Sequence, residues 1–77
     1  MFEPKTKTIS VSGRELVIQE ITAGQLNEMG ESASALVAAG IQSPAVTVEQ
    51  VNQWPSSIVM TIADHVSKLN GFDEGNA

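Results

Sequence analysis

His65 is where a search for catalytic chemistry begins, because histidine is the most common general base and this chain has one. Its acidic neighbour, Asp64, is adjacent in sequence. Adjacent helical residues do not face each other, so Asp64 cannot orient the imidazole. The candidate nucleophile Ser57 lies eight residues earlier, which on a helix is about 12 Å along the axis. We therefore expect His65 to be a half-exposed residue on a helix, outside any catalytic pair.

Metal and cofactor chemistry lacks its usual residues. The chain has no cysteine, and its six glycines are scattered singly, which leaves no glycine-rich loop for a phosphate or a dinucleotide. One histidine and no cysteine make no zinc-type ligand set. We expect a protein that is not an enzyme, has no catalytic residues and uses neither a cofactor nor a metal.

A carrier function is the nearest chemical alternative. Acyl carrier proteins are short, acidic and helical, and attach their prosthetic group to the serine of an Asp-Ser-Leu motif at a helix start. Ser57-Ile58 resembles that motif in part, but Ser56 replaces the aspartate. The enzyme or carrier class is therefore kept as a third hypothesis. A mass increase on Ser57 after treatment with a phosphopantetheinyl transferase would identify a carrier.

The charge of the chain argues against nucleic acid. Four basic residues against nine acidic ones give a net charge of −5, whereas phosphate binding needs concentrated Lys and Arg. Lys5, Lys7 and Arg14 cluster near the N-terminus, where we expect them to form the solvated edge of a hairpin. A recognition helix over residues 56–70 would carry a single cation, Lys68.

The length and hydropathy of the chain limit its organisation. Seventy-seven residues predict one small domain, 1–77, with a small core. Either its helices pack very well, or a partner chain or a second copy in a homo-oligomer completes the core. The N-terminal residues resemble no signal peptide. No apolar stretch approaches the roughly 20 residues of a membrane span. We therefore expect a cytoplasmic protein that does not contact a membrane.

The first predicted element is a β-hairpin over residues 6–21. Ile9 and Val11 alternate with polar residues, as a half-buried strand requires. Gly13-Arg14 has the length of a hairpin loop, with Gly13 suited to the positive φ of a type II′ turn. The return strand follows at once. An unpaired outer edge on the first strand would allow strand addition.

The remainder of the chain predicts helices. Thr22 and Gln25 have the spacing of a capping box, as do Thr47 and Gln50. Together with apolar residues at helical spacing, they predict helices over residues 23–39, 47–54 and 56–70. Residues 41–46 are expected to form a loop and residues 73–77 a disordered tail. The predicted fold class is α+β, an N-terminal hairpin followed by about three helices, with the helical part dominant.

This order of elements resembles that of bacteriophage tail assembly chaperones. The resemblance covers about residues 7–72 and is carried by the two ends of that range: the strand, Gly13-Arg14 turn, strand and cap from Lys7 to Thr22, and the close from Trp54-Pro55-Ser56-Ser57 to Leu69-Asn70-Gly71-Phe72. It implies a non-enzymatic protein of the host cell cytoplasm. Such a protein binds the tail tape-measure protein, and in some cases tube subunits, and keeps their apolar helical surfaces from aggregating before assembly.

Helix-in-groove binding of that kind needs an apolar surface with adaptable and aromatic residues. Methionine adapts to its contacts and tryptophan anchors them. The candidate partner-binding residues are Leu26, Met29, Leu36, Trp54 and Met60. The alternative explanation of the same residues is that they form the core. The alternative function is a small phage or prophage adaptor or inhibitor that binds a folded host protein.

Overall fold

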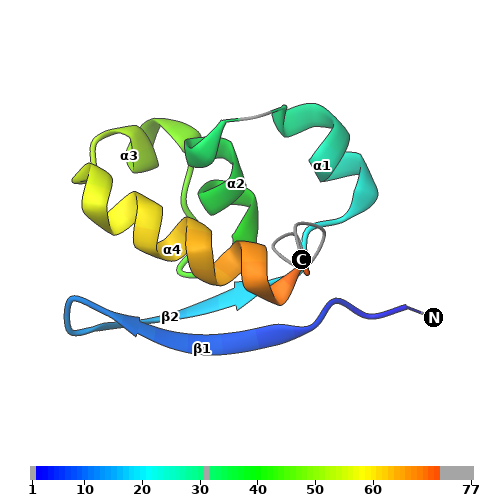
Figure 1. Ribbon diagram of the computed structural model, residues 1–77, viewed down its shortest axis with the longest axis horizontal. Helices are drawn as coiled ribbons and strands as arrows, with labels where there is room; N and C mark the ends of the chain where they lie inside the picture. The colour runs from blue at the N-terminus through cyan, green and yellow to red at the C-terminus, as the bar shows by residue number, and fades with distance from the viewer. Residues whose placement is uncertain (1, 31, 72–77) are drawn as a thin grey trace.

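The computed structural model describes residues 2–30 and 32–71, and in this part of the chain helices cover one face of a small sheet (Figure 1). The three strands are antiparallel in the order β1-β2-β3. The fold is α+β with helices dominant, as the sequence predicted. The elements in chain order are β1 (Thr6–Val11), β2 (Arg14–Gln19), α1 (Ala23–Met29), α2 (Ala33–Gly40), β3 (Ile41–Ser43), α3 (Val48–Asn52) and α4 (Ser56–Leu69).

The hairpin forms where the sequence places it, but its turn is different. Val11 pairs with Arg14, so the two loop residues are Ser12 and Gly13, with φ of 51° and 79°. Two successive positive φ values are those of a type I′ turn, which matches the twist of the flanking strands. The predicted Gly13-Arg14 loop is therefore wrong by one residue, and Arg14 is the first residue of β2.

The predicted helix over residues 23–39 is two helices. The first, α1, ends at Met29, and its cap Gly30 has a φ of 62°, which favours glycine. Ser32 then caps α2 through a hydrogen bond from the Ala35 backbone N–H to its hydroxyl. The predicted capping box of Thr22 and Gln25 is confirmed at the start of α1.

The segment predicted as a loop, 41–46, begins with a strand. Ile41 pairs with Ile18 of β2, and both side chains are buried. This pairing joins residues more than twenty positions apart, so it depends on the packed fold and not on the local sequence. The expected loop is shortened to residues 44–46.

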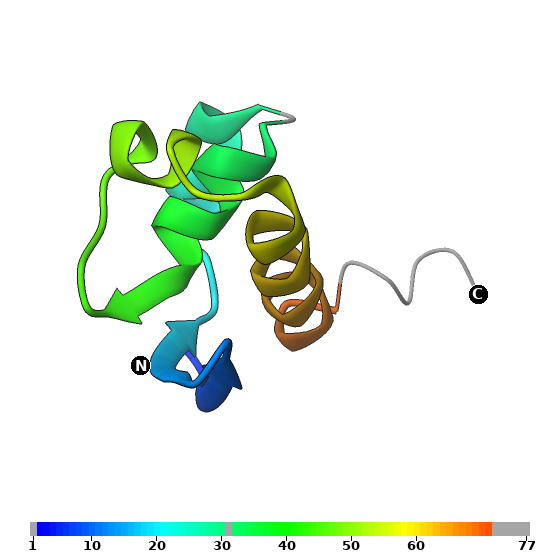
Figure 2. The ribbon, with the colours of Figure 1, turned by 90° about the vertical axis from the view of Figure 1, so that its left-hand side faces the viewer.

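The last two helices start within one residue of their predicted positions. The capping box of Thr47 and Gln50 is confirmed, although α3 ends at Asn52 and not at residue 54. The N-cap of α4 is Pro55, whose carbonyl accepts hydrogen bonds from the N–H groups of Ile58 and Val59. The second view shows α4 running beside α2, with the sheet below them (Figure 2).

The core lies between the sheet and α2, α3 and α4. No described residue of α1 is buried. The buried hydrophobic residues are Ile9, Val11, Leu16, Ile18, Val37, Ile41, Val51, Val59, Ile62, Ala63 and Val66. None of the helices in the described part of the chain is long and apolar enough to cross a membrane. The tail predicted to be disordered, 73–77, lies outside the described residues.

Candidate partner-binding pocket

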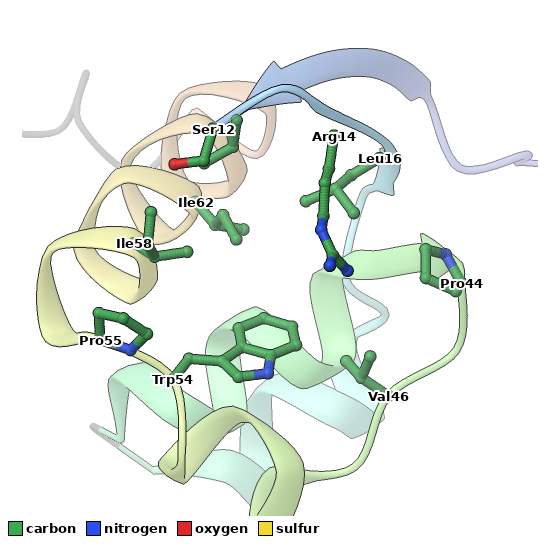
Figure 3. Close-up of a pocket in the computed structure, with 10 residues that line it drawn as sticks. Ser12, Arg14, Leu16, Pro44, Val46, Trp54, Pro55, Ile58 and Ile62 are labelled. Carbon is green, nitrogen blue, oxygen red and sulfur yellow. The ribbon is translucent and has the colours of Figure 1, made fainter.

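An apolar pocket of about 510 Å³ opens at the turn end of the hairpin (Figure 3). Three segments enclose it: the hairpin next to its turn, the connection from β3 to α3, and the junction of α3 with α4. Ser12 and Arg14 are the polar residues of the lining, and the others are apolar. The lining residues are Val11, Ser12, Arg14, Leu16, Pro44, Val46, Trp54, Pro55, Ile58 and Ile62.

Trp54 forms the wall of this pocket opposite the hairpin (Figure 3). The end of α3 positions it, because its backbone N–H donates to the Val51 carbonyl at 3.0 Å. Its indole is half-buried and packs against the core. With Val46, it also lines a second depression of about 360 Å³ beside Gln50 and Gln53. A ligand can therefore contact Trp54 from either depression.

Arg14 reaches the pocket because of strand alternation. Successive side chains of a strand point to opposite faces, so Arg14 shares the face of Leu16 and Ile18, which are buried beneath the helices. The strand begins at Arg14, where the pocket opens, and its guanidinium points into the pocket (Figure 3). Arg14 is exposed, as the predicted solvated edge requires, and its spacing of two from Leu16 is the signal that assigns it to the inner face.

The lining of the pocket suits an apolar group with a negative charge beside it. Its apolar walls suit an apolar side chain, and Arg14 supplies a positive charge with several donors. Neither histidine nor a carboxylate lines it. Within residues 2–30 and 32–71, no group of three or more His, Cys, Asp or Glu side chains is placed to hold a metal ion.

The residues singled out for partner binding are distributed over several surfaces. Among those whose side chains the structure describes, only Trp54 lines the pocket. Leu36 is partly buried and packs against the core. Leu26 on α1 is 43% exposed and Met60 on α4 is 61% exposed. The side chain of Met29 lies outside the described part of the structure.

The residues first considered for catalysis, Ser57, Asp64 and His65, lie on α4 outside the pocket. His65 is half-exposed, as expected. Asp64 pairs with Lys68 one turn later at 3.1 Å, and both side chains are more than half exposed. Ser57 is exposed, and its backbone carbonyl accepts a hydrogen bond from the hydroxyl of Thr61 at 2.8 Å.

Comparison with protein-family models, with curated proteins and with solved structures finds no match to this chain.

Proposed function

We propose that this chain is a non-enzymatic bacteriophage tail assembly chaperone that binds apolar helical segments of the tape-measure protein in the pocket beside Trp54. The observation that supports the proposal most is where the two segments of the sequence resemblance meet. Arg14 belongs to the first segment and Trp54-Pro55 to the second, and they line the same pocket. The two segments that carry the resemblance are therefore distant in sequence but line one apolar pocket.

The pocket has the properties that such binding requires. Its volume of about 510 Å³ lies within the range of about 300–1,000 Å³ common for binding pockets. Half-buried tryptophans with surrounding apolar contacts are frequent anchors of protein interfaces. An amphipathic helix presents apolar side chains one turn apart, and one of them can enter a pocket of this kind while its neighbours contact the rim.

The Asn70 side chain gives the second resemblance segment a structural role as well. Its Oδ1 accepts a hydrogen bond from the Ile21 backbone N–H at 2.9 Å, and its Nδ2 donates to the Val66 carbonyl at 2.8 Å. It therefore ties the end of α4 to the chain that leaves the hairpin. The closing motif of the sequence thus stabilises the position of α4, whose first turns line the pocket.

Co-expression with the long helical tail protein of the same phage genome tests the proposal. We expect the two proteins to co-purify and the soluble fraction of the tail protein to rise. The Trp54→Ala variant should lose both effects, whereas Met60→Ala should keep them, because Met60 is exposed on α4 but does not line the pocket.

Circular dichroism checks that each variant is folded, and Trp54→Phe keeps an aromatic anchor if the alanine variant unfolds. Failure of the natural chain to co-purify with the tail protein would refute the chaperone proposal. A stable complex with a folded host protein, with no effect on the tail protein, would instead favour the adaptor or inhibitor alternative.

A further inference from the structure

We propose that the segment bound in the Trp54 pocket is acidic: an apolar anchor side chain flanked by carboxylates that pair with Arg14. This inference rests on the proposed function, since it specifies the chemistry of the partner at the same pocket. It concerns a property that the resemblance does not supply, the sign of the charge beside the anchor.

The strand register fixes the position of Arg14 at the pocket. Its register opposite Val11 places it on the helix-facing side of the hairpin, in line with Leu16. At that end of the sheet the helices no longer cover the strand, and the guanidinium extends over the apolar lining (Figure 3). The charge is therefore held at the opening by the fold of the hairpin.

Within the described residues, no ion pair involves Arg14. The ion pair that the structure shows there is between Asp64 and Lys68 on α4, and no carboxylate lines the pocket. Arg14 is thus available to a bound molecule. Arginine pairs with carboxylates through two parallel hydrogen bonds. Because Arg14 is exposed, such a pair gives a modest gain in affinity that salt weakens.

The net charge of the chain opposes the inferred preference and so makes it diagnostic. The chain carries a net charge of −5, so its general field repels an acidic partner and attracts a basic one. A preference for an acidic segment would therefore oppose the field of the whole chain. Only a local cation at the binding site accounts for such a preference, and among the residues that line the pocket this cation is Arg14.

The competing explanation is that Arg14 serves the fold alone. Its methylene groups then shield the apolar lining from water while the guanidinium stays solvated. In that case the charge of a bound segment has no specific partner, and the general field decides the preference.

Trp54 makes the test direct, because it is the only tryptophan of the chain. The probes are three twelve-residue amidated helical peptides without tryptophan, with the same leucine stripe and with Glu, Gln or Lys at the positions flanking it. Titration at low salt, followed by Trp54 emission, gives three dissociation constants. We expect the Glu peptide to bind about two- to fivefold more tightly than the Gln peptide, and the Lys peptide most weakly.

Two variants assign the preference. Arg14→Gln should bring the Glu and Gln peptides to equal affinity. Lys7→Gln makes the same change in net charge on β1, away from the pocket lining, and should keep the preference. Equal affinities, a preference for the Lys peptide, or a preference that survives Arg14→Gln would overturn the inference while leaving the pocket a binding site. No response of Trp54 to any peptide would overturn the pocket itself, and the proposed function with it.

Discussion

Gly40 shows how closely single residues control the packing of this small core. It is the last residue of α2, and a Cβ built on it lies 2.6 Å from Cγ1 of the buried Val66 on α4. We predict that Gly40→Ala lowers the free energy of unfolding by about 1–3 kcal/mol, because α2 and α4 must move apart. Urea denaturation measures it. In the double variant Gly40→Ala with Val66→Ala, the loss in free energy of unfolding should be less than the summed losses of the two single variants, because the clash is relieved. Losses that simply add would contradict this explanation.

Gly24 offers the same substitution with the opposite expected sign. It lies in α1 without a positive φ, and the nearest atom to a built Cβ is the Thr22 hydroxyl oxygen at 4.0 Å. Alanine there restricts the unfolded chain and costs no contact. We predict that Gly24→Ala raises the free energy of unfolding by about 0.4–1 kcal/mol. Denaturation under the conditions used for the Gly40 variant measures it, and a destabilised Gly24 variant would show that α1 packs more tightly than the structure indicates.

Asn70 is the residue whose side chain joins two distant segments. Asn70→Ala leaves the half-buried Ile21 N–H without its acceptor and the Val66 carbonyl without one donor. We predict a loss of about 1–3 kcal/mol in the free energy of unfolding. Asn70→Asp keeps an acceptor for Ile21 but places a carboxylate oxygen against the Val66 carbonyl at the C-terminal end of α4, so it should not recover the loss. Asn52→Ala is the matched control: its hydrogen bond to Ser34 is exposed, and its removal should change stability least.

At the scale of elements, α1 is the helix least supported by the core. It has seven residues, and none of those whose burial is described is buried. Its main contact is with α2. Local opening is easiest where few apolar contacts resist it. We predict that the amide hydrogens of α1 exchange with deuterium markedly faster than those of α4, as measured by NMR in the native chain. Equal protection of the two helices would show that α1 opens only with the whole fold.

The starts of elements were predictable from the sequence because capping is local. Thr22 and Thr47 each bond a backbone N–H three residues later, and short spacing suffices to identify them. The break between α1 and α2 carried a signal too, since Ser32 is an N-cap residue close after Gly30. The strand β3 carried none, because Ile41 becomes a strand residue only when Ile18 is beside it.

The candidate pocket was predictable only in part. Trp54 was identified because tryptophan is a frequent anchor of protein interfaces. Arg14 was grouped with Lys5 and Lys7 by nearness in sequence. The register places Arg14 at the turn end of the sheet and Lys7 opposite Ile18 toward the other end, so Arg14 reaches the pocket and Lys7 does not. The opening itself depends on three segments meeting in space, and the sequence gives no distance between them.

At the scale of the whole molecule, the sheet leaves the outer edge of β1 unpaired within the described residues. The register identifies which residues face that edge. The Glu20 N–H donates to the Lys5 carbonyl at 2.9 Å, and Ile9 and Val11 lie in step with this pair. Hydrogen-bonded pairs alternate along an antiparallel ladder, so Lys7 bonds inward to β2. Thr6, Thr8 and Ser10 direct their backbone groups outward.

Thr8→Pro and Lys7→Pro therefore form a matched pair at two exposed positions of β1. We predict that Thr8→Pro keeps the melting temperature of the natural chain within a few degrees, because the lost N–H pointed outward. Lys7→Pro should lower the free energy of unfolding by about 1–3 kcal/mol, because it removes a ladder bond to β2. Thermal denaturation followed by circular dichroism separates them, and equal losses would show that the register is wrong. The pair also tests the homo-oligomer alternative. An assembly built by strand addition at this edge would dissociate to monomers in sedimentation when Thr8 is proline, while the hairpin stays folded.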